Sequence, residues 1–152
     1  GLEIFADKSE YNKNTKILKL DGSVKIFDNI QNFEINSEKI IYNKILEKIT
    51  SKTKTKIIID NSHIISGKNI VFFKTKLEIQ SNEPSTIKDK FNNLIKLKGF
   101  SYSSKTKILK TSEMKLIDNL LRNNSFDKSL NNISCNNGLK VASICANIFD
   151  NN

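Results

Sequence analysis

The chain has 152 residues, 38% of them hydrophobic, and a formal net charge of +9, which suits one domain with its own apolar core. Arg122 is the only arginine among the 25 basic residues. Because arginine is preferred for bidentate contacts with phosphate or guanine, this composition disfavours a nucleic-acid reader and indicates a solvated, lysine-rich surface. The sequence contains neither a long apolar run nor a charged-then-apolar amino-terminal segment, so we expect no membrane span and no signal peptide in it.

Alternation of apolar and polar residues is the main pattern along the chain. Three segments, 23–27, 48–59 and 76–80, place their apolar residues on one parity and mostly polar residues on the other. The apolar residues are Val24, Ile26, Ile49, Ile57, Ile59, Leu77 and Ile79. A period of two in segments rich in Ile, Thr, Val and Phe is typical of half-buried β-strands.

Polar clusters are expected to divide these strands into short pieces. Turns are predicted at residues 20–23, 28–32, 60–62, 66–69 and 81–85. Only residues 114–121 carry a helical stripe, and a strand followed by a turn is preferred there as well. The sequence therefore predicts an all-β fold.

A repeated phrase indicates internal periodicity. TKILK occurs at residues 15–19 and 106–110, each time four residues after a tyrosine. Aromatic residues that end a short apolar strand recur at Tyr11, Tyr42, Phe73 and Tyr102, with spacings of 31, 31 and 29 residues. The two phrases are 91 residues apart, or three of these periods. A unit that cannot bury its own apolar face must stack on its neighbours, so we expect stacked β-units around an elongated apolar interior.

This repeat makes a positional prediction. Leu18 and Leu109, or their neighbours Ile17 and Ile108, should face the same interior from opposite ends of the stack. The end strands of such a stack would carry backbone groups ready to pair with a similar domain.

Residues that could support catalysis are few. His63, the only histidine, lies where a turn enters a strand, and a solvated or turn-bonded imidazole is expected there rather than a general base. Cys135 and Cys145 lack a second pair, so no zinc site is expected; both a disulfide and two free thiols remain open. The aromatic residues mostly share the core parity, which favours packing over base stacking. We therefore expect no enzyme activity and no cofactor.

Residues 6–26 (ADKSEYNKNTKILKLDGSVKI) and 35–42 (INSEKIIY) resemble the OstA-like repeat of the lipopolysaccharide transport proteins. The matching positions are Ala6, Asp7, Tyr11, Thr15, Leu18, Gly22, Val24 and Ile26 in the first phrase and Ile35, Ile40 and Tyr42 in the second. Within the family the chain is most similar to the amino-terminal periplasmic domain of the outer-membrane protein LptD; the bridge LptA is second, and the tethered LptC is also a candidate. The resemblance implies a twisted β-jelly roll over residues 3–122, with irregular strands or a frayed end at 123–152.

The resemblance also implies a function and partners. A non-enzymatic module would conduct lipopolysaccharide across the periplasm of a Gram-negative bacterium for outer-membrane assembly. Its partners would be lipopolysaccharide acyl chains, homologous jelly-roll proteins paired edge to edge, and the outer membrane, through a barrel that these residues do not include. Nucleic acid is not an expected partner. The alternative is a purely structural or protein-interaction β-solenoid, which would have a fully filled interior. The residues expected to contact lipid are Tyr11, Leu18, Val24, Ile26, Ile35, Tyr42, Ile57, Ile59, Phe72 and Ile79.

Overall fold

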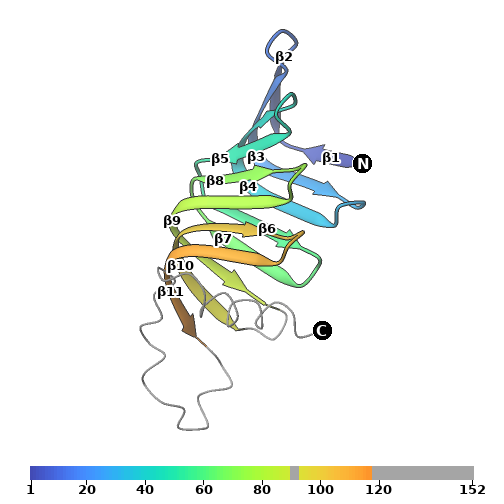
Figure 1. Cartoon of the computed structure of the whole chain (residues 1–152). Helices are drawn as coiled ribbons and strands as arrows, with labels where there is room; N and C mark the ends of the chain where they lie inside the picture. The colour runs from blue at the N-terminus through green and yellow to red at the C-terminus, as the bar shows by residue number, and fades with distance from the viewer. Residues whose placement is uncertain (90–92, 118–152) are drawn as a thin grey trace, which may run out of the picture.

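The computed structural model describes residues 1–89 and 93–117, which form one antiparallel sheet of eleven strands (Figure 1). The all-β expectation is therefore confirmed. None of the described residues belongs to a helix long and apolar enough to cross a membrane. The strands are β1 (Leu2–Phe5), β2 (Lys8–Asn12), β3 (Ile17–Asp28), β4 (Phe33–Asn43), β5 (Lys48–Ser51), β6 (Thr55–Ile59), β7 (His63–Gly67), β8 (Ile70–Phe73), β9 (Glu78–Lys88), β10 (Leu94–Ser103) and β11 (Ile108–Ile117).

The sheet bends along its length into two facing walls. We define wall 1 as β1, β6 and β7 together with residues 24–28 of β3, 33–37 of β4, 85–88 of β9, 94–98 of β10 and 113–117 of β11. Wall 2 comprises β2, β5 and β8 with the other halves of the same long strands. The long strands pass between the walls at the bend edge, and the hairpin turns lie at the opposite edge, which we call the turn edge.

Bulges, rather than turns, carry the long strands around the bend. The register shifts between Asp21 and Val24 in β3 and between Lys98 and Phe100 in the β9–β10 pair. Gly22 has a φ of 77°, which favours glycine, and a Cβ there would lie 2.9 Å from that of Asp7. The turns expected at 20–23 and 81–85 are therefore wrong, because both segments lie within continuous strands.

The strand expected from the alternation over residues 48–59 is interrupted at the bend edge. β5 ends at Ser51 and β6 begins at Thr55, so Ile49 belongs to wall 2 and Ile57 to wall 1. Four hydroxyl groups meet at this break, since the Oγ of Ser37 lies 2.8 Å from those of Ser51 and Thr53 and 3.0 Å from that of Thr55. Mutual hydrogen bonds therefore satisfy polar groups that the packing buries.

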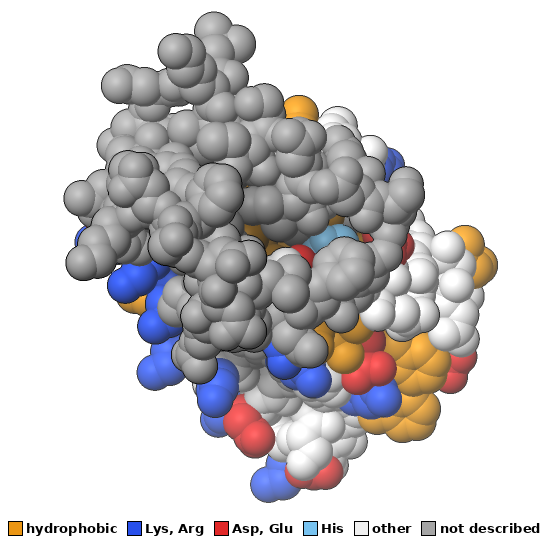
Figure 2. All heavy atoms as spheres, turned by 90° about the horizontal axis from the view of Figure 1, so that it is seen from below, with side chains coloured by type: hydrophobic (Ala, Val, Ile, Leu, Met, Phe, Trp, Pro, Cys, Tyr) orange, Lys and Arg blue, Asp and Glu red, His pale blue; other side chains and the backbone are white. Residues whose placement is uncertain are grey.

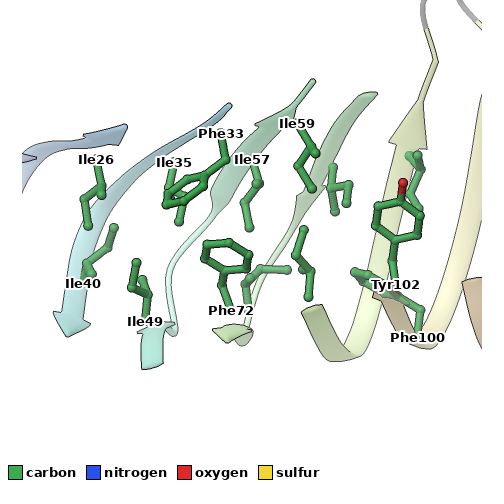
Figure 3. Packing of buried hydrophobic residues seen from close by; sticks show 14 of the residues in the cluster. Ile26, Phe33, Ile35, Ile40, Ile49, Ile57, Ile59, Phe72, Phe100 and Tyr102 are labelled. Carbon is green, nitrogen blue, oxygen red and sulfur yellow. The ribbon is translucent and has the colours of Figure 1, made fainter. Parts of the chain in front are cut away.

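Two continuous rows of apolar residues line the interior (Figure 3). Directly paired residues share one face of a sheet, so each row can be followed from strand to strand. The row of wall 1 is Ile4, Ile26, Ile35, Ile57, Ile65, Ile87 and Ile95. The row of wall 2 is Tyr11, Leu18, Tyr42, Ile49, Phe72, Ile79, Tyr102 and Leu109.

The wall 2 row tests the repeat. Leu18 and Leu109 lie on this same row, near its two ends, as expected from the two TKILK phrases. The third anchor of the repeat is Phe72 rather than Phe73, because Phe73 has the opposite parity and points outward. With that correction the anchors are 31, 30 and 30 residues apart, and each repeat contributes two strands to each wall.

The two walls are offset along the stack. The rings of Phe33, on β4 of wall 1, and Phe72, on β8 of wall 2, have centroids 4.8 Å apart. His63, on β7 of wall 1, and Tyr102, on β10 of wall 2, have centroids 6.4 Å apart. In both contacts the wall 2 strand is two places further along the sheet order. This offset equals one repeat, so the wall 1 strands of each repeat cover the wall 2 strands of the next.

Candidate functional site

The interior between the walls is the candidate site, and all ten residues expected to contact lipid lie on its inner faces. Eight of them belong to the two rows just described. Val24 and Ile59 occupy neighbouring inner positions of wall 1, paired with Ser37 and Phe33. The alternation therefore assigned the inner face correctly at every position chosen. Whether these side chains meet lipid stays a prediction.

Several interior residues were not in the predicted set. They share the parity of their neighbours and are Leu20, Phe33, Ile40, Ile49, Ile65, Ile70, Ile87, Ile95, Leu97, Phe100, Tyr102, Leu109 and Met114. Strand alternation in the sequence could have assigned these residues to an inner face. It could not have shown that they line one continuous interior, because that depends on which strands pair.

The middle of the interior is closely packed. Ile26, Ile57 and Ile79 are 0% exposed, and Phe72 is 1% exposed. The edge-to-face contact of Phe33 with Phe72 joins the walls directly. Lipid could enter this part only if the walls moved apart.

The interior is less covered at the end of the stack near β1 and β2. Because wall 1 is offset by two strands, the inner faces of β2 and the first half of β3 extend past it. Tyr11 is consequently 45% exposed and Leu18 is only partly buried, whereas Tyr42, the next member of the row, is 6% exposed. This uncovered apolar shelf, Tyr11 and Leu18, is continuous with the packed interior.

Ion pairs connect the walls along the turn edge. Lys74 of wall 2 lies 3.8 Å from the carboxylate of Asp28 in wall 1 and 3.4 Å from that of Glu47. Lys107 of wall 2 lies 2.9 Å from the carboxylate of Asp60 in wall 1. These contacts, with the ring contacts above, hold the two walls together at the turn edge. We call the part of each wall at this edge its lip.

Asp28 is the most buried member of these pairs, at 3% exposed. Its burial acts to raise the pKa, but the N–H groups of Gln31 and Ile30, which donate to the carboxylate, and the charges of the amino terminus and Lys74 outweigh it. The pKa of Asp28 is therefore held below its usual value. An ionised carboxylate is thus stable at this lip of wall 1.

The expected solvated position of His63 is wrong. The imidazole is 7% exposed and lies on the inner side of wall 1 near Tyr102, because His63 opens β7 at an inward-facing position. Its Nδ1 lies 2.8 Å from the Oγ of Ser62, so the expected bond to a turn residue is present.

Neither cysteine lies within the described residues, so their pairing stays open, and residues 123–152, for which irregular strands or a frayed end were expected, lie outside them as well. The described residues contain no group of three or more His, Cys, Asp or Glu side chains that could hold a metal ion.

Many lysines of the described residues are exposed, and in the view of Figure 2 lysine side chains lie among acidic and apolar ones. Phe27 and Phe73 point outward and are exceptions to the core parity expected of most aromatic residues. Phe27 stacks on Phe5, and lysine ammonium groups lie over the ring of Phe73.

Comparison with solved structures shows a clear likeness in fold. No protein-family model matches the chain, and no curated protein sequence matches it. The solved structure of LptH from Pseudomonas aeruginosa, an LptA homologous periplasmic component of the lipopolysaccharide transport device, superposes with a TM-score of 0.66. The match covers 78% of this chain and 94% of LptH, with 12% sequence identity. At this identity the likeness shows the fold, and the described residues therefore form an LptA-like β-jelly roll.

Proposed function

We propose that this protein is a non-enzymatic module that binds the acyl chains of lipopolysaccharide between its walls and conducts the lipid across the periplasm. The observation that carries the proposal is the apolar interior, built from two rows of large side chains that run the length of the stack. The fold shared with LptH and the OstA-like phrases in the sequence support the same assignment. The resemblance to the LptD domain, and with it an association with the outer membrane, remains a hypothesis from the sequence pattern.

Binding would require the packed walls to separate at the turn edge. Burying about ten acyl methylenes stabilises a complex by ~0.8 kcal/mol each, or roughly 8 kcal/mol in total. The Lys107–Asp60 pair has side chains 37% and 40% exposed, and such pairs contribute about 1 kcal/mol or less. The apolar gain therefore exceeds the cost of breaking this exposed pair, and parting the Lys74 pairs and the Phe33–Phe72 contact adds to that cost. The shelf of Tyr11 and Leu18 offers a place where a chain can begin to enter.

Homologous jelly-roll proteins are the proposed protein partners. β1 and β2 each pair only with β3 among the described strands, so each has a free edge for a further strand. All residues of β2 are exposed. A partner added at this end would also cover the apolar shelf and extend the interior.

Photo-crosslinking tests the proposal directly. A benzophenone amino acid placed at Leu18, Ile26 or Ile59 should form an adduct with lipopolysaccharide on irradiation. The same probe at Ile108, which is 49% exposed and points away from the interior, should form none. Circular dichroism would confirm that each variant is folded, and the absence of an adduct at all three interior positions would refute lipid conduction.

The alternative function is a structural or protein-interaction scaffold, and the close contact between Phe33 and Phe72 favours it. A scaffold would keep its interior filled when lipid is added. Methyl NMR distinguishes the two functions, because lipid entry shifts the signals of Ile26 and Ile59, whereas a permanently filled interior leaves them unchanged.

A further inference from the structure

A groove of about 710 Å³ lies on the outer face of wall 2, on the opposite side of the sheet from the interior. One cross-strand row, Glu10, Lys19, Ile41, Thr50 and Val71, runs across it through consecutive pairings of β2, β3, β4, β5 and β8. These residues alternate with the inward-facing ones and therefore point away from the interior. The groove is thus separate from the proposed lipid site.

Apolar side chains form the middle of this groove. Ile41 is 46% exposed and Val71 is partly buried, and both point outward, whereas the lining residues Leu20, Ile40 and Ile70 of the same strands have the inward parity and are buried. The volume falls within the range of about 300–1,000 Å³ that is typical of small-molecule sites. An exposed isoleucine in a concave site of this size favours an apolar ligand group.

Charged side chains border the apolar middle. Two of the four lysines that line the groove are paired within it, Lys19 with Glu10 at 3.4 Å and Lys39 with Asp21 at 3.0 Å. The other two, Lys8 and Lys52, form no ion pair with any residue that the structure describes. The lining therefore carries four lysines against two carboxylates, an excess of two positive charges.

We propose that this groove binds a single-chain anionic amphiphile, an alkyl carboxylate or alkyl phosphate. The alkyl chain would lie over Ile41 and Val71, and the anionic head would meet Lys8 or Lys52. An uncharged amphiphile would lack the head contact, and a small inorganic anion would lack the apolar contact. Because the sheet separates the groove from the interior, this site does not depend on the proposed transport function.

Titration with laurate below its micelle concentration, followed by methyl NMR, tests the site. We expect the signals of Ile41 and Val71 to shift with saturation. Ile41→Glu should weaken binding about tenfold, because it removes apolar contact and adds a like charge. Ile108→Glu is the matched control, since Ile108 is an outward strand isoleucine of similar exposure, 49%, at the far end of wall 2. The affinity of this variant for laurate should stay at the wild-type value.

A second pair of variants tests the charge. Lys52→Glu should weaken laurate binding about fivefold or more, in line with the attraction of one lysine for an anionic head. Lys115→Glu changes the net charge equally on the outer face of wall 1 and should leave the affinity unchanged. Inorganic phosphate and dodecyl maltoside should each bind far more weakly than laurate. Equal effects of Lys52→Glu and Lys115→Glu would overturn the specific head contact.

The outcomes separate this site from the interior. Shifts confined to interior methyl groups such as Ile26, unaffected by Ile41→Glu, would overturn the groove and support the transport function. Shifts of the groove methyl groups without any lipopolysaccharide adduct in the interior would support the groove and overturn the transport function.

Discussion

Asp28 gives the sharpest test of how the lips of the walls are held. Its carboxylate accepts hydrogen bonds from the N–H groups of Ile30 at 3.0 Å and Gln31 at 3.1 Å and lies 3.8 Å from Lys74. Asp28→Ala removes Oδ1, the acceptor of both hydrogen bonds, from a site that is 3% exposed. At about 1.5 kcal/mol for each hydrogen bond to a charged group, the free energy of unfolding should fall by about 3 kcal/mol.

Two further variants show how much of this loss comes from the charge and how much an exposed carboxylate would cost. Asp28→Asn keeps an oxygen acceptor and loses only the charge, so the expected loss is about 1 kcal/mol. Asp21→Ala is the control, because its side chain is 55% exposed and it forms an ion pair with Lys39, a class worth about 1 kcal/mol or less. Urea unfolding followed by far-ultraviolet circular dichroism is the suitable assay, since the chain contains no tryptophan.

The pH dependence of the same variants has a defined sign. Because the pKa of Asp28 is lower in the folded protein, its contribution is complete above the unfolded value of about 4 and is lost as pH falls through the folded pKa. The difference in stability between wild type and Asp28→Asn should therefore shrink below about pH 4. A constant difference from neutral pH into this range, or a loss for Asp28→Ala no greater than that for Asp21→Ala, would refute the reasoning.

Two other predictions follow from the inner face and the turn edge. Ile57→Ala should lower the free energy of unfolding by about 3 kcal/mol because the side chain is fully buried, whereas Ile58→Ala, on the outer face, should cost about 1 kcal/mol or less. Equal losses in urea unfolding would show that the faces are assigned wrongly. Burial, a hydrogen bond with Glu47 and the charge of Glu47 raise the pKa of Tyr42, so Tyr42 should ionise only late in an alkaline absorbance titration. Because Tyr102 is buried as well, Tyr42→Phe should lower the amplitude of the late phase by the contribution of one tyrosine, and an unchanged amplitude would contradict the assignment.

Local alternation predicted the faces of the strands well. The period of two placed Val24, Ile26, Ile57 and Ile59 correctly, because neighbouring residues in a strand point to opposite faces whatever the tertiary fold. It failed at the third repeat, where Phe72 and Phe73 are both aromatic and only the pairing of β5 with β8 shows which one faces inward. The Gly22 segment was equally ambiguous, because glycine serves in turns and in bulges alike.

Contacts between the walls could not be predicted from local patterns. Asp60 and Lys107 are 47 residues apart in the chain, and their proximity depends on the offset of the walls. The same offset explains why Tyr11, which has the correct parity, is exposed while Tyr42 is buried. The burial of His63 also follows from tertiary packing, since its local sequence resembles an ordinary turn.

The offset between the walls bears on the cooperativity of folding. Because one repeat buries the inner face of the next, the melting of a single internal repeat would expose apolar surface on both of its neighbours. Such mutual dependence favours unfolding in large steps, even though each repeat contacts only those beside it. It also means that a stack with an additional repeat would have a longer interior and the same uncovered shelf at its first strands, so the length of the interior and the shape of its uncovered end can vary independently.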